Sequence, residues 1–90
     1  MIKDSNKFDL EERTAKFGEE IILFCKSLKQ DVITRPLINQ LIRSGTSIGA
    51  NYCEANNASS KKDFRNKIFI CKKEAQELTL ILQKITNSLK

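Results

Sequence analysis

Six basic residues gather in one short stretch of the sequence, and they are the side chains with the clearest potential for chemistry. They occupy positions between 61 and 73, namely Lys61, Lys62, Arg65, Lys67, Lys72 and Lys73. Ammonium and guanidinium groups bind phosphates electrostatically and with little regard to base sequence. The stretch therefore predicts a surface for RNA or DNA. The alternative is a solvated helix face that only keeps the protein soluble.

The distribution of charge along the chain supports a binding role for this stretch. The chain carries a net charge of +5, whereas residues 1–60 contain eight basic and eight acidic residues and are neutral overall. The whole excess lies in residues 61–90, which contain eight basic and three acidic residues. A positive face of this kind attracts polyanions.

A helix over residues 60–89 is expected to position these cations. Its apolar residues recur at alternating spacings of four and three, which is typical of a helix that packs on other helices along a continuous seam. Ser60 and Asp63 are spaced as a capping box at its start. Phe69 lies within the basic stripe, where it either stacks on an unpaired base or makes a second packing contact. The seam consists of Phe64, Ile68, Cys71, Ala75, Leu78, Leu82, Ile85 and Leu89.

Two further helices are predicted, over residues 9–29 and 35–56. Asp9 with Glu12 predicts a capping box at the first, and Thr34 is a plausible N-cap of the second. The connector at 30–34 is short, so the two helices should be antiparallel. The apolar stripe of the first helix predicts that its residues are core, and the wide apolar arc of the second suits contact with two neighbours. The first stripe contains Leu10, Thr14, Phe17, Ile21, Phe24, Cys25 and Leu28.

The middle of the second helix, residues 44–50, is rich in small residues and contains Gly45 and Gly49. Each glycine costs about 1 kcal/mol of helix stability relative to alanine. The helix therefore either breaks near Gly45, or continues and lets a neighbouring backbone come close. The agreement of the apolar pattern on both sides favours continuation.

The polar face of this helix contains a ridge with spacings of four, four and three. It is formed by Arg43, Ser47, Asn51 and Glu54. The common outcome for such a ridge is a solvated face. The alternative is a hydrogen-bonded seam with another subunit.

Length and composition limit the remaining possibilities. Ninety residues make one domain, over 1–90, and a domain of this size buries only ~60% of its unfolded surface. No run of ~18 apolar residues and no signal peptide is present, which predicts a cytoplasmic protein with no membrane partner. The three scattered cysteines are expected to be free, small apolar residues. Without a histidine, the sequence predicts no catalytic residue, no metal site and no cofactor.

Residues 40–55 resemble the signature of a bacterial family, the four-helix-bundle proteins encoded in intervening sequences of 23S ribosomal RNA. Gln40, Leu41, Arg43, Ser47, Ile48, Asn51 and Glu54 match its pattern, and Ser60, Lys62, Asp63, Phe64, Ile68, Ile70, Glu77 and Leu78 match its third helix. The resemblance covers about residues 8–89 and implies that residues 40–55 are helical. Ala55 stands where the family usually has glycine, and Tyr52 and Cys53 replace smaller or aliphatic residues.

Family members usually continue into a fourth helix, whereas this chain stops at Lys90. The expected fold is therefore all-α, an antiparallel bundle of three long helices whose fourth helix is absent or supplied by another subunit. Exposing Leu or Ile side chains costs about 1.5–3 kcal/mol each. A homo-oligomer is expected to cover them, with an interface formed by Leu78, Leu82, Ile85 and Leu89 together with the ridge Arg43, Ser47, Asn51 and Glu54.

The resemblance also implies partners. The family includes the accessory protein of diversity-generating retroelements, a pentameric barrel with a positively charged surface that associates with nucleic acid and a reverse transcriptase. Two functions are therefore weighed: an oligomeric, non-catalytic protein that binds RNA or DNA through the basic stripe, and a scaffold that docks an acidic protein such as an element-encoded polymerase.

Overall fold

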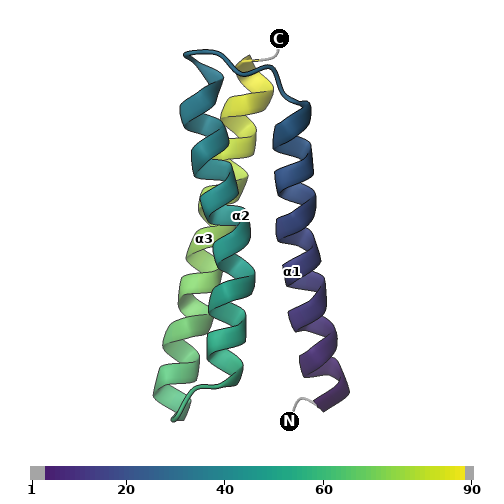
Figure 1. Cartoon of the computed structure of the whole chain (residues 1–90). Coiled ribbons are helices and arrows are strands. Elements are labelled where there is room, and N and C mark those ends of the chain that lie inside the picture. Colours follow the sequence, from purple (N-terminus) through teal and green to yellow (C-terminus); the bar gives the residue numbers. More distant parts are fainter. Residues whose placement is uncertain (1–3, 89–90) are drawn as a thin grey trace.

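The computed structural model describes residues 4–88, with side chains described from residue 9 onward, and this part of the chain is three helices without strands. They are α1 (Asp4–Ser27), α2 (Thr34–Asn56) and α3 (Lys61–Ser88). They alternate in direction, so both connections lie at the ends of a long, narrow molecule (Figure 1). The predicted all-α, antiparallel three-helix fold is confirmed, while Leu89 and Lys90 lie outside the described residues.

The start of the first helix was predicted wrongly. α1 begins at Asp4, five residues before the expected capping box at Asp9 and Glu12. Asp9 instead lies inside the helix and pairs with Arg13 across one turn, at 3.7 Å. A favourable local cap does not end a helix when the residues before it can continue the same backbone conformation.

The turn between α1 and α2 is organised by Asp31 rather than by Thr34 alone. One oxygen of Asp31 accepts hydrogen bonds from the amides of Ile33, at 2.9 Å, and Thr34, at 2.8 Å. These bonds to Thr34 and Ile33 lower the pKa of Asp31, because they stabilise its charged form. Thr34 is the first helical residue, and its hydroxyl donates to the carbonyl of Lys29 at 2.7 Å.

The second connection follows the prediction more closely. The hydroxyl of Ser60 accepts the amide of Asp63 at 3.0 Å, and the Ser60 carbonyl accepts the amide of Phe64 at 3.0 Å. Ser60 therefore caps α3 as expected, which leaves the α2–α3 turn tightly defined at the base of the basic stripe.

α2 lies between the other two helices. It packs against both α1 and α3, whereas the described parts of α1 and α3 have no Cα atoms within 8 Å of each other (Figure 1). The molecule is long and narrow, with extents of 45 × 22 × 16 Å. The wide apolar arc of α2 is explained by these two neighbours.

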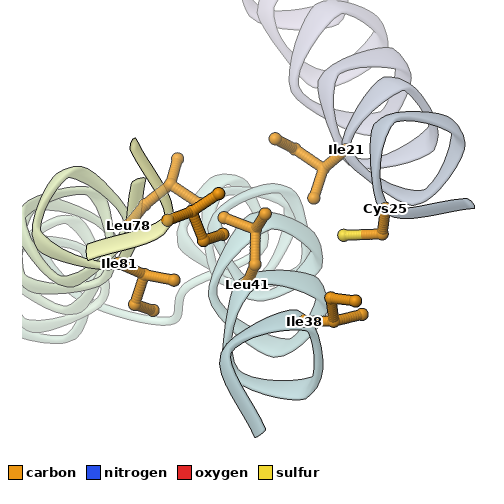
Figure 2. Close-up of a cluster of buried hydrophobic side chains, with 7 residues drawn as sticks. Ile21, Cys25, Ile38, Leu41, Leu78 and Ile81 are labelled. Atoms are coloured by element: carbon orange, nitrogen blue, oxygen red, sulfur yellow. The ribbon is translucent and has the colours of Figure 1, made fainter. Parts of the chain in front are cut away.

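The main core cluster is centred on α2, and Tyr52 and Ala55 are buried outside it. Leu41 is fully buried and points between Leu78 and Ile81 of α3 on one side and Ile21 and Cys25 of α1 on the other (Figure 2). Ile38 and Ile85 complete the cluster. Because one α2 side chain contacts both flanking helices, the cluster holds the three helices as one unit.

α2 runs without a break through its glycines, as favoured from the sequence. A Cβ atom at Gly45 would lie 3.0 Å from the side chain of Ile21, and one at Gly49 would lie 3.2 Å from the backbone of Thr14. Both distances are shorter than nearly all real Cβ contacts. The glycines therefore let α1 approach closely, which offsets their low helix propensity.

The predicted core of α1 is only partly correct. Ile21 and Cys25 are buried, but Phe17 and Phe24 are 36% and 40% exposed and Leu10 is 40% exposed. The reason is that α1 has one helical neighbour instead of two, so only the stripe that faces α2 is covered. None of the helices in the part described here is both long and apolar enough to span a bilayer.

Candidate nucleic-acid interface on helix α3

The side of α3 that faces α2 is an ion-paired seam. The guanidinium of Arg43 donates to Glu77 at 2.8 Å and to Glu74 at 3.3 Å. Bonding to Glu77, then to Glu74, raises the pKa of Arg43. Glu77 was named in the sequence only as a match to the family's third helix and Glu74 was not singled out, although their spacing of three places them one turn apart on a single helix face.

Lys67 belongs to the same seam. Its ammonium group donates to Glu54 of α2 at 2.8 Å, and this bond raises the pKa of Lys67. Asp63, one turn earlier on α3, adds a further favourable charge. Lys67 was predicted to contact phosphate together with five other residues, but the structure separates it from them and pairs it within the chain.

The structure adds contacts within the chain to the two alternatives raised from the sequence for the ridge on α2. Arg43 and Glu54 form ion pairs with α3 of the same chain, and Ser47 and Asn51 are half-buried with side chains bonded to the α2 backbone. The ridge is an intrachain seam. A role for these residues between subunits stays a prediction.

The opposite side of α3 presents the other five predicted cations. Lys61, Lys62, Arg65, Lys72 and Lys73 are all exposed, and at 100° per residue they fall with Phe69 within about 120° of arc. We call this set of six residues the outer face of α3. Phe69 is 65% exposed at its centre, so within this chain it is not a packing contact.

The outer face carries no acidic residue. The three acidic residues of α3 are Asp63, Glu74 and Glu77; the two glutamates bond to Arg43, and Asp63 acts on Lys67. None of the five outer cations forms an ion pair within the residues described. The positive charge of α3 is thus concentrated on one side because its negative charge is used on the other.

Only some residues of the apolar seam predicted on α3 are buried, and their spacing did not show which ones. Leu78 and Ile85 are buried in the chain's own core, and Leu82 is half-buried. Ile81 is also buried, although it does not belong to the predicted repeat. It lies four residues before Ile85 and three after Leu78, so a broader stripe centred on Ile81 would have found it.

The remaining part of the repeat stays partly open. Phe64 is 37% exposed, Ile68 and Cys71 are half-buried, and Ala75 is exposed. Another subunit was predicted to cover Leu78, Leu82, Ile85 and Leu89. It is not needed to cover Leu78 or Ile85, because the chain's own core buries both. Leu82 keeps partial exposure, and Leu89 lies outside the described residues.

The cysteines are free thiols with three different surroundings. Cys25 is buried in the core, and burial raises its pKa; burial also raises the pKa of the half-buried Cys71. Cys53 is exposed, which differs from the expectation that all three behave as small apolar residues. Within residues 4–88, no group of three or more His, Cys, Asp or Glu side chains is arranged to hold a metal ion.

The fold and this surface define a class: a small all-α bundle with surface ion pairs between α2 and α3 and a cationic face on the opposite side of α3. The comparison with protein families agrees with that class. The sequence matches the family described as 23S rRNA-intervening sequence protein over residues 6–88, so the chain belongs to that family. No curated protein and no solved structure matched the chain.

Proposed function

We propose that this chain is a cytoplasmic, oligomeric helical-bundle protein that binds RNA or DNA through the outer face of α3 and has no catalytic role. One observation carries the proposal: Lys61, Lys62, Arg65, Lys72 and Lys73 are exposed on a face from which every acidic residue of α3 is absent. A phosphate backbone is a matching line of negative charge, and contacts of this kind do not need base recognition.

Assembly is the second part of the proposal. Phe17 and Phe24 keep more than a third of their surface exposed, and among the described residues α1 and α3 each pack against α2 alone. Covering such side chains is favourable by about 25 cal/mol per Å² of apolar surface. Repetition of the outer face in an oligomer would let weak phosphate contacts act together.

The test is a salt titration of binding with labelled single- and double-stranded RNA and DNA. Wild type should bind at low salt and weaken as salt rises, with a slope of about −0.7 to −0.9 per phosphate contact. The variant K62E/R65E/K72E/K73E should bind about 100-fold more weakly or worse, because four attractive contacts become repulsive.

A matched control reverses four exposed cations away from α3. The variant K16E/K26E/K29E/R35E has the same net charge as the first but leaves the outer face intact. It should bind far better than the α3 variant. Equal losses in both variants, salt-independent binding, or no binding to any of the four nucleic acids would contradict the proposal.

The alternative is a scaffold whose cationic face docks an acidic protein partner. The same exposed cations favour it, since they are complementary to any extended acidic surface. Pull-down from the host with and without nuclease separates the two functions. A protein that is retained after nuclease treatment favours the scaffold, and a protein lost with the nucleic acid favours the first proposal.

A further inference from the structure

A hollow lies at the foot of the outer face, where the α2–α3 turn meets the first turns of α3. It has a volume of about 490 Å³ and is lined by Ala58, Ser59, Ser60, Phe64 and Ile68, with Lys61 and Arg65 at its edge. More of its exposed lining is apolar than polar. It is therefore an apolar recess directly beside two of the phosphate-binding cations proposed above.

We propose that this hollow holds one unpaired nucleobase, which gives the protein a preference for single-stranded over double-stranded nucleic acid. The inference rests on the proposed function and deepens it. Phe64 supplies an aromatic ring that is 37% exposed, and Ile68 supplies an adjacent aliphatic surface. Stacking on an aromatic side chain is the usual means by which proteins hold single strands without sequence preference.

The phosphate attached to that base would meet positive charge on two sides. Lys61 and Arg65 belong to both the hollow and the outer face, so a strand can leave the hollow along the cationic surface. Both cations lie in the first two turns of α3, at the end of the helix that adjoins the hollow. Ser60 holds this end in place through its bonds to Asp63 and Phe64.

A duplex cannot use the hollow in the same way. Its bases are paired and stacked, and bringing one out requires unstacking that costs a few kcal/mol. A duplex would therefore bind only through phosphate contacts along the outer face. The expected result is stronger binding of a single strand at equal salt, with the same dependence on Lys72 and Lys73, which lie away from the hollow.

The test compares a labelled 12-nucleotide single-stranded RNA, the matching single-stranded DNA and a 12-base-pair duplex. Wild type should prefer the single strands by about tenfold, the effect of one stacked base. Phe64→Leu keeps the apolar volume but removes the ring, and it should lose most of that preference while duplex affinity and the salt slope stay unchanged. Phe24→Leu, at an exposed aromatic on α1 outside both the hollow and the outer face, is the matched control and should retain the preference.

A second measurement uses wild type alone, so it does not require any variant to fold. Photo-crosslinking of wild type with 5-bromouridine RNA should label the segment 58–68 more strongly than any other. Absence of a single-strand preference, equal behaviour of Phe64→Leu and Phe24→Leu, or crosslinks confined to other segments would overturn the inference. If one of these results is found but the variant K62E/R65E/K72E/K73E still abolishes binding, only the role of the hollow is wrong. If that variant does not abolish binding, the proposed function is wrong as well.

Discussion

Charged residues of the same types have opposite surroundings on the two sides of α3. On the side facing α2, Lys67 is bonded to Glu54, and Glu74 and Glu77 are bonded to Arg43. On the outer face, five cations are exposed and none forms an ion pair within the described residues. The comparison teaches that a basic helix becomes a polyanion surface only when its acidic residues are used elsewhere.

The comparison also separates stability from binding. The inner side contributes Leu78, Ile81 and Ile85 to the core, while the outer face contributes no residue to it. Changes on the inner side should therefore alter folding and leave the affinity of the folded protein for polyanions intact. Changes on the outer face should do the reverse, and the first three of the predictions below test this division.

The largest expected effect comes from two neighbouring positions on opposite sides. Ile81→Ala should lower the free energy of unfolding by about 2–5 kcal/mol, because it opens a cavity in a core site that is 6% exposed. Leu80→Ala, at a position 64% exposed, should change it by less than about 0.5 kcal/mol. Urea unfolding followed by circular dichroism measures both; similar losses at the two positions would break the distinction between sides.

The next effect compares two lysines within one turn and a half of α3. Lys72→Gln should weaken binding of single-stranded RNA about fivefold at 0.1 M salt and reduce the salt slope by about 0.7, because one phosphate contact is lost. Lys67→Gln should leave both quantities nearly unchanged, since Lys67 is already bonded to Glu54. Fluorescence anisotropy over a salt series measures the two variants, and a larger loss for Lys67→Gln would reverse the assignment of the faces.

A smaller effect is expected from the ion pairs of the inner side. Arg43→Met removes the bonds to Glu74 and Glu77 and should cost less stability than Ile81→Ala, because the guanidinium is 57% exposed. The loss should shrink in 1 M salt, which screens exposed charges. Thermal unfolding at low and high salt measures it. A loss that does not depend on salt would mean that packing of the arginine stem, rather than charge, holds the seam.

The smallest effect concerns the turn that sets α2 relative to α1. The pKa of Asp31 is lowered in the folded protein by its bonds to Thr34 and Ile33, so its ionised form stabilises the fold. That contribution is complete above the unfolded pKa of about 3.9 and is lost as pH falls through the lower folded value. Asp31→Asn should therefore be less stable than wild type at pH 7, and the difference should shrink below about pH 4. An unfolding series from pH 7 to pH 2 measures it; a constant difference would exclude titration of Asp31 as its source.

Local patterns in the sequence were sufficient for several features. The apolar periodicity predicted three helices, the short connector at 30–34 predicted that the first two are antiparallel, and the Ser60 signal located the start of α3 to within one residue. The wide arc of α2 predicted two neighbours, and the small residues around Gly45 and Gly49 predicted close approach of another backbone. These features depend on residues within a few turns of one another, so spacing along the chain contains them.

The spacing of residues along the chain could not predict which cations are free to contact a phosphate. Lys67 and Lys72 have the same chemistry and lie in the same basic stretch, and only the position of Glu54 on another helix distinguishes them. Likewise, Phe17 and Ile21 share one apolar stripe, yet the first is 36% exposed and the second 7% because α1 has a single helical neighbour. The amino-acid order determined the helices and their total charge. The tertiary structure decided which charges are paired and which apolar residues are covered, because both depend on the side chains that other helices bring opposite to them.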